Sequence, residues 1–224
     1  MVPSPVAALE RAVEIPADRV VLHGILELPD HPAGLVLFAH GSGSSRLSPR
    51  NQRVAIDLHH SRLGTLLFDL LSEEEERLDA FTASYRFDIP QLARRLLAAT
   101  DWVLAQSELA ALPLGYFGTS TGAAAALVAA AERPESVRAV VSRGGRPDLA
   151  GEALGRVRAP TLLVVGAEDR EVLALNQRAM REMTADVAID VIPGATHLFE
   201  EPGTLELAAE AAARWFVRHF AVAT

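Results

Sequence analysis

The amino-acid sequence predicts an α/β fold in which a mainly parallel sheet of about eight strands is covered by helices on both faces. Short runs of apolar residues, each of strand length, recur along the chain, and segments with helical periodicity separate most of them. Alternating strands and helices favour a parallel sheet wrapped on both sides. The chain has 224 residues, half of them hydrophobic, so we expect a single domain over residues 1–224.

An antiparallel hairpin is predicted at the start of the chain. Residues 1–9 are expected to be a loose tail. Two apolar-rich runs, Ala12–Ile15 and Arg19–Leu28, flank Pro16-Ala17-Asp18, which is a turn signal. The two runs are therefore expected to pair as neighbouring strands.

The next part of the chain alternates buried strands with helices. The expected elements are, in order, strand Gly34–His40, helix Ser48–Arg62, strand Gly64–Leu70, a polar segment over 72–88 and helix Ile89–Gln106. Continuous apolar runs predict the strands, because a strand covered on both faces has no polar side. Ser48-Pro49 is an N-cap followed by proline at the first helical position. Within the polar segment, Glu73–Glu76 are expected to form the solvated start of a short helix.

The same alternation continues to the end of the chain. The expected elements are strand Leu114–Phe117, an alanine-rich helix ending near Ala131, strand Val137–Ser142, a short helix over 148–156, strand Pro160–Gly166, helix Arg170–Thr184, strand Val187–Ile192 and helix Leu205–Phe220. The alanine-rich segment is predicted from helix propensity, and the last helix from its amphipathic pattern.

The sequence Gly118-Thr119-Ser120-Thr121-Gly122 stands between a strand and the alanine-rich helix. A serine nucleophile must stand clear of its backbone, and a sharp strand-to-helix turn lifts Ser120 out at a strained φ/ψ. Side chains at Gly118 and Gly122 would collide with the neighbouring helix and strand. Ser120 also lies at a helix N-terminus, where free N–H groups favour negative charge, and the N–H of Thr121 is the natural first oxyanion donor.

An acid and a base follow later strands. Ser120, Asp169 and His197 each come just after a predicted strand, so all three are expected at the same edge of the sheet. Their order along the chain is the order of the α/β-hydrolase triad. Glu168 is the competing acid.

Together these motifs resemble the α/β hydrolases of the dienelactone-hydrolase-like group over nearly the full length of the chain. The residues that carry the resemblance are HGSGSS at 40–45, GTSTG at 118–122, VVGAEDR at 164–170 and PGATHLFEEP at 193–202. The resemblance implies the α/β-hydrolase fold and a serine hydrolase that cleaves small carboxylic esters through an acyl-enzyme intermediate.

The resemblance also implies a role for each site residue. His197 would take the proton of Ser120, and Asp169 would hold the His197 ring in the right tautomer. The backbone N–H of Ser42, with Gly43 as its substitute, would be the second oxyanion donor. His40 is expected to make structural hydrogen bonds within its loop.

One position departs from the dienelactone hydrolases proper. They use a cysteine nucleophile, whereas position 120 is serine and the chain has no cysteine. This difference favours ordinary carboxylic esters over dienelactone as substrates. No substantial lid is expected, because only residues 143–159 lie between two successive strands at the place where related enzymes insert a helical cap.

Arginines at the predicted active edge suggest how a substrate is held. They are Arg46, Arg50, Arg143 and Arg146. Arginine suits bidentate binding of a carboxylate or phosphate, so Arg46 or Arg143 is hypothesised to bind an anionic group of a small ester substrate. In the alternative interpretation these arginines pair with acids such as Asp69, Asp88 or Asp148 and hold loops in place.

Composition argues against several kinds of partner. A net charge of −8 disfavours nucleic acid or an anionic membrane. No run is long and apolar enough to span a membrane, and the N-terminus lacks the pattern of a secretory signal, so a cytoplasmic location is expected. No cofactor and no metal are expected: the histidines lack ligand spacing, and adjacent His59-His60 are expected to be partly exposed helix residues. We expect a monomer or a homodimer.

Other functions stay open at this point. A thioesterase, an acyltransferase or a peptidase uses the same triad, because the motifs do not encode the acceptor of the acyl group. A non-catalytic binding module could share the fold.

Overall fold

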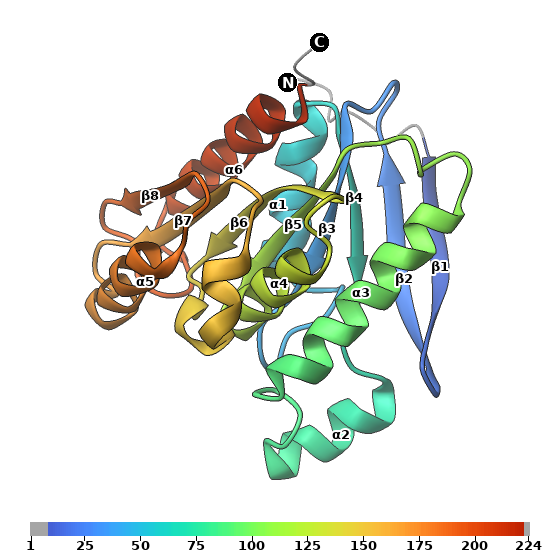
Figure 1. Cartoon of the computed structure of the whole chain (residues 1–224), viewed down its shortest axis with the longest axis horizontal. Coiled ribbons are helices and arrows are strands. Elements are labelled where there is room, and N and C mark those ends of the chain that lie inside the picture. The colour runs from blue at the N-terminus through green and yellow to red at the C-terminus, as the bar shows by residue number, and fades with distance from the viewer. Residues whose placement is uncertain (1–8, 222–224) are drawn as a thin grey trace.

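Eight strands form one sheet in the order β1-β2-β4-β3-β5-β6-β7-β8 (Figure 1). The computed structural model describes residues 9–221. The strands are β1 (Leu9–Ala17), β2 (Val20–Leu28), β3 (Gly34–Ala39), β4 (Leu63–Phe68), β5 (Leu114–Thr119), β6 (Val137–Arg143), β7 (Thr161–Gly166) and β8 (Val187–Ile192). β2 is antiparallel to β1 and to β4, and all other neighbours are parallel. The predicted mainly parallel sheet is confirmed.

The central strands are buried on both faces. Every residue of β3, β4, β5 and β7 is buried, which explains why their sequences are nearly continuous apolar runs without alternation. β8 lies at the edge of the sheet, and most of its residues are only half-buried.

Helices cover both faces of this sheet (Figure 1). They are α1 (Pro49–His60), α2 (Glu73–Thr82), α3 (Ile89–Ala105), α4 (Thr121–Glu132), the 3₁₀ helix η1 (Pro147–Arg156), α5 (Arg170–Glu182) and α6 (Thr204–Phe220). α1 and α6 share one core cluster through residues such as Leu58 and Phe216. α3, α4, α5 and η1 contribute to the cluster on the opposite face, which includes Leu96 and Leu127.

The N-terminal hairpin is confirmed and is longer than predicted. β1 begins at Leu9, which pairs with Leu28, so the expected tail is wrong at residue 9; its residues 1–8 lie outside the described part of the chain. Pro16 is wrongly placed in the predicted turn, because it pairs with Val21 within the hairpin. A proline is tolerated there since β1 is an edge strand. The turn instead passes through Asp18, whose φ is 53°.

α2 stands apart from the two helical layers, beyond the end of β4 (Figure 1). Ser72 caps it through a capping box with Glu75. Glu73 and Glu74 are exposed as predicted, but Glu75 is half-buried and accepts a hydrogen bond from Arg95 Nη2 at 2.9 Å. Glu76 is half-buried as well, so the expectation of a wholly solvated acidic run is wrong at Glu75 and Glu76.

The segment between β6 and β7 holds only the short helix η1, which is broken at Gly151, where φ is 53°. The prediction that no substantial lid follows β6 is confirmed. The helix that stands beside the candidate site is instead α2, which follows β4.

His59 contradicts the expectation of a partly exposed side chain. It is 4% exposed, and its Nε2 lies 2.9 Å from Thr65 Oγ1 on β4. Burial, with a smaller contribution from His60, lowers the pKa of His59 to about 4. The imidazole is therefore neutral at pH 7, and α1 presents it to the sheet as a polar core residue.

Candidate active site

The candidate site lies where the strand order of the sheet reverses. β4 lies on one side of β3, and β5 to β8 follow on the other. In parallel α/β sheets, ligands bind outside the carboxyl ends of the strands at such a reversal. The loops after β3 and β5 meet there, since a Cβ on Gly41 would lie 2.9 Å from Ser120 Cβ.

Ser120 stands on a sharp turn between β5 and α4. Its φ is 49° and its ψ is −122°, a strained conformation for an L-residue. A Cβ on Gly118 would lie 2.4 Å from Ala123 Cα, and a Cβ on Gly122 would lie 2.2 Å from Ala39 O. The prediction that side chains at these two positions would collide with the helix and the neighbouring strand is confirmed.

Ser42 and Thr121, the predicted oxyanion donors, lie side by side. Ser42 Oγ is 3.1 Å from Thr121 Oγ1, so a hydroxyl hydrogen bond joins the loop after β3 to the first residue of α4. Within residues 9–221, neither backbone N–H donates a hydrogen bond. Both N–H groups are therefore available to a substrate oxygen.

Asp169 and His197 form a close pair. His197 Nδ1 lies 2.6 Å from Asp169 Oδ2. Because a carboxylate only accepts, Nδ1 is the donor, and Nε2 of the neutral ring is left as a proton acceptor. Glu168, the competing acid, is exposed. Its backbone N–H donates to Ala195 O at 3.0 Å, which ties the loop after β7 to the loop that carries His197.

Ser120 and His197 line one small cleft of about 260 Å³. In the described part of the chain no hydrogen bond joins Ser120 Oγ to the His197 ring. In related sites the distance between nucleophile and base often shortens only when substrate binds. The other lining residues are Gly41, Ser42, Ser44, Ser48, Arg50, Asn51, Thr119, Arg143, Gly144 and Leu198. The three predicted triad residues thus meet at one edge of the sheet.

The arginines at this edge differ in their partners. Arg46 pairs with Asp69, through its guanidinium and through its backbone N–H at 2.8 Å. Arg146 pairs with Asp148 at 2.7 Å. The interpretation that these arginines hold loops in place is confirmed for both pairs. Arg46 is not among the residues that line the Ser120 cleft.

Arg143 has no such partner in the described part of the chain. It is 7% exposed, and its Nη1 is buried without a hydrogen-bond partner among the described residues. The guanidinium lies 5.5 Å from the ring centroid of Phe199. Burial first, and then the nearby Arg50, lowers the pKa of Arg143 to about 10, so it remains a cation at pH 7.

Asn51 is a polar residue of the cleft that the sequence did not single out. It is 2% exposed, and its Oδ1 is buried without a hydrogen-bond partner among the described residues. Its place in the first turn of α1, directly after the loop that follows β3, could have drawn attention to it, because such turns face the carboxyl edge of the sheet.

His40 makes hydrogen bonds within the loop framework, as predicted. The backbone N–H of Leu70 donates to His40 Nε2 at 2.9 Å, so Nδ1 carries the proton and donates to Gly41 O at 2.9 Å. Burial lowers the pKa of His40, which keeps the ring neutral. His40 therefore joins β3, β4 and the loop between β3 and α1.

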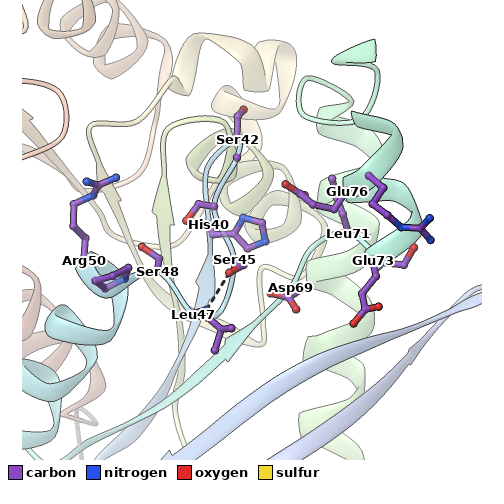
Figure 2. A pocket seen from close by; sticks show the side chains of 15 residues that line it. His40, Ser42, Ser45, Leu47, Ser48, Arg50, Asp69, Leu71, Glu73 and Glu76 are labelled. Atoms are coloured by element: carbon purple, nitrogen blue, oxygen red, sulfur yellow. Dashed lines mark hydrogen bonds between the residues drawn. The ribbon is translucent and has the colours of Figure 1, made fainter. Parts of the chain in front are cut away.

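A second and larger cleft of about 680 Å³ lies on the other side of the loop that follows β3. Figure 2 shows Glu73 and Glu76 of α2 on one side of it and Ser48 and Arg50 on the other. Ser42, Ser44, Ser48 and Arg50 border both clefts. The larger cleft thus continues from the Ser120 cleft toward α2 and carries more acidic groups.

The sheet order, the strained serine and the three residues at the carboxyl edge define an α/β hydrolase. The chain belongs to the dienelactone hydrolase family, whose sequence model, described as "Dienelactone hydrolase family", matches residues 69–222. It is 54% identical to a dienelactone hydrolase from Anabaena variabilis ATCC 29413, whose crystal structure aligns with a TM-score of 0.92 over 94% of this chain and 98% of that chain.

More distant solved structures share the fold. Est1E from Butyrivibrio proteoclasticus is 17% identical and has a TM-score of 0.79, with 94% of this chain and 99% of that chain covered. An esterase domain from Rhodothermus marinus is 19% identical and has a TM-score of 0.74, with 95% and 99% covered.

A curated relative carries a different name. A protein of Mycobacterium tuberculosis (strain H37Rv), named "Putative phosphoribosyl transferase", is 56% identical over 210 residues, which are 94% of this chain and 46% of that protein. The chain thus spans about half the length of the curated relatives it matches.

Two features are absent from residues 9–221. None of the helices within residues 9–221 is both long and apolar enough to cross a membrane. No group of three or more His, Asp or Glu side chains in that range is arranged to hold a metal ion.

Proposed function

We propose that this protein is a serine hydrolase that cleaves small carboxylic esters through an acyl-enzyme formed on Ser120. The observation that carries the proposal is the 2.6 Å contact between His197 Nδ1 and Asp169 Oδ2, at a cleft that His197 shares with a serine of positive φ. This arrangement supplies a base of fixed tautomer at the same cleft as the half-buried Ser120.

In the acylation step, Ser120 Oγ attacks the ester carbonyl carbon and its proton passes to His197 Nε2. The carbonyl oxygen becomes an oxyanion, which the N–H groups of Ser42 and Thr121 stabilise; each such donor contributes about 3–4 kcal/mol to lowering the barrier. Asp169 stabilises the imidazolium. When the C–O bond to the alcohol breaks, His197 gives its proton to the leaving oxygen.

In the deacylation step, water replaces the alcohol. His197 Nε2 takes a proton from the water as its oxygen attacks the acyl carbon, and the same two N–H groups bind the second oxyanion. Collapse of this intermediate breaks the bond to Ser120 Oγ, which recovers its proton from His197. The products are a carboxylic acid and the free enzyme.

Fluorophosphonate labelling followed by intact-mass analysis tests the proposal. We expect one adduct on the wild type and none on Ser120→Ala. Ser136→Ala, a serine outside the cleft, is the matched control and should label like the wild type. Absence of an adduct on the folded wild type would overturn the proposal in favour of a non-catalytic binding module.

An ester panel then separates the enzymes that share this chemistry. Thioesterase, acyltransferase and peptidase activities begin with the same acyl-enzyme and differ in the leaving group or the acceptor. Product analysis with oxygen esters, thioesters, peptides and added alcohols identifies which one dominates. The M. tuberculosis relative is named a transferase over a length of which the aligned region is 46%, and the Ser120 cleft favours acyl transfer over phosphoribosyl transfer.

A further inference from the structure

We propose that a second copy of this chain binds to the edge strand β8, so that the sheets of two molecules join into one across a two-fold axis. The partner strand is the β8 of the other copy, and the two strands run antiparallel about Ile189. This edge lies three strands away from β5, which precedes the nucleophile (Figure 1). The inference does not depend on the proposed function.

The two edge strands of the sheet differ in how they are protected against pairing. β1 contains Pro16, which has no backbone N–H, and the charged residues Glu10, Arg11 and Glu14. Such residues hinder the addition of a further strand. β8 has the sequence VAIDVI, which contains no proline, lysine or arginine and a single acid, Asp190. β8 is thus an edge rich in Val and Ile, with high strand propensity and little protection.

The outer backbone groups of β8 have no partner strand among residues 9–221. β8 pairs with β7 on its inner side, where Asp186 O and Ile192 O accept backbone hydrogen bonds at 2.8 and 3.0 Å. The N–H and C=O groups of successive residues in a strand point to opposite edges. The groups that point outward therefore belong to Val187, Ile189 and Val191.

The side chains of these three residues lie on one face of the strand and are apolar. They are half-buried, apart from Val191, which is 38% exposed. In an antiparallel pair about Ile189, this residue faces its own copy, and Val187 faces the partner's Val191. Each of the three residues then donates one backbone hydrogen bond to the other strand and accepts one, and β-branched side chains meet across the strands.

The acids of this segment select that register. A two-fold axis requires one residue to face its own copy, because hydrogen-bonded and non-hydrogen-bonded pairs alternate along the strands. Centring the pair on Asp190 would place two carboxylates opposite each other, and centring it on Ala188 would place Asp190 opposite Asp186. Centring it on Ile189 places Asp190 opposite Ala188. The strand is therefore complementary to itself, which identifies a second copy as the occupant.

Disulfide cross-linking tests the register, because the chain has no cysteine. Oxidation of Ile189→Cys with copper phenanthroline should give a covalent dimer, since the Cα atoms of such a hydrogen-bonded pair lie about 5.5 Å apart, within the range of a disulfide. Val187→Cys is the matched control and should not cross-link, because its copy would lie about 13 Å away along the strands. Equal cross-linking of the two variants, or none in either, would overturn the proposed pairing.

Sedimentation equilibrium gives a second measurement, which begins with the unaltered chain. We expect a reversible dimer that predominates at about 100 µM, since one added strand pair forms a modest interface. Val191→Lys should raise the dissociation constant of the dimer by at least about 10-fold, because a lysine on an edge strand opposes pairing. Leu9→Lys on β1 is the matched control, since Leu9 is also 38% exposed, and it should keep the wild-type constant. A wild type that stays monomeric at this concentration, or a dimer that Val191→Lys leaves intact, would overturn the proposal.

Discussion

Two buried arginines of this molecule, Arg95 on α3 and Arg143 at the end of β6, are equally withdrawn from solvent and differ in what surrounds them. Their exposed fractions are 6% and 7%. Arg95 donates to Ala17 O at 2.6 Å and to Glu75 Oε1 at 2.9 Å. Arg143 has neither kind of partner among the described residues and faces the Ser120 cleft.

The difference separates a charge that is paired within the fold from a charge that has no acidic partner among the described residues. Arg95 ties β1, α2 and α3 together, and removing it would leave Glu75 without its cation. Burying the Arg143 guanidinium costs desolvation energy. Among the described residues, only a weak cation–π contact with Phe199 offsets part of this cost. Stability should therefore respond in opposite ways to changes at these two positions.

The largest expected effect lies in the Ser120 cleft. Ser120→Ala should lower kcat by about 10⁴- to 10⁶-fold, because the nucleophile of a triad is lost. The free energy of unfolding should change little, since alanine keeps the same strained backbone conformation and the serine makes no side-chain cap hydrogen bond. Steady-state kinetics and urea unfolding measure the two quantities. A loss of stability as large as the loss of activity would mean that Ser120 is a structural residue.

The next effect concerns the paired arginine. Arg95→Met should lower the free energy of unfolding by about 3 kcal/mol, because Glu75 would remain half-buried without its cation. Among folded molecules kcat/KM should not change. Urea unfolding and ester kinetics on the same sample test both points. A stability within about 0.5 kcal/mol of the wild type, the range of ordinary surface substitutions, would remove the contrast with Arg143.

The pH dependence of stability shows what an unpaired buried cation costs this fold. The pKa of His59 is lowered to about 4 in the folded protein, whereas an unfolded histidine titrates near about 6.5. The unfolded chain therefore binds the extra proton first, and stability is lost as the pH falls from about 6.5 toward about 4. Between pH 7 and about pH 5 the loss should be about 2 kcal/mol.

His59→Gln is the control for this prediction. Glutamine keeps a polar group near Thr65 and cannot titrate, so urea unfolding of this variant should lose the dependence that is due to the histidine. His60→Gln, a change at the exposed neighbour, should keep it. Equal pH profiles for the wild type and His59→Gln would show that the imidazole does not carry the effect.

The smallest effect is expected at Arg46, the other arginine hypothesised to bind substrate. Its side chain is 28% exposed and pairs with Asp69. Arg46→Gln should lower the free energy of unfolding by less than about 1 kcal/mol, the usual contribution of a partly exposed ion pair. The ratio of kcat/KM for an anionic ester to that for a matched neutral ester should stay at the wild-type value. A fall in that ratio would show that Arg46 contacts anionic substrates.

The residues that could be predicted from the sequence are those with a local signal. Continuous apolar runs predicted the buried strands, and the glycines at 118 and 122 predicted the close approach of α4 to β5 and β3. Asp169 and His197 were predicted because each follows a strand, although they are 28 residues apart.

Long-range pairing carries no such signal. Glu75 meets Arg95 across 20 residues, so an acidic run that reads as solvated is partly buried. His59 is buried because it lies on the face of α1 that packs against the sheet. The adjacent His60 is the same residue type, so the sequence does not show which of the two is buried. Arg46 and Arg143 are the same residue type, and both are predicted to lie at the active edge. Only the three-dimensional structure shows that Arg46 has an acidic partner.

The most direct test of the account is the free energy of unfolding of Arg143→Met, measured by urea unfolding beside the wild type and Arg95→Met. The account predicts that Arg143→Met is as stable as the wild type or more stable by about 1–2 kcal/mol, because an unpaired buried charge is replaced by an apolar side chain. A loss of about 3 kcal/mol, as expected for Arg95→Met, would contradict it, since such a loss would mean that Arg143 is paired within the fold.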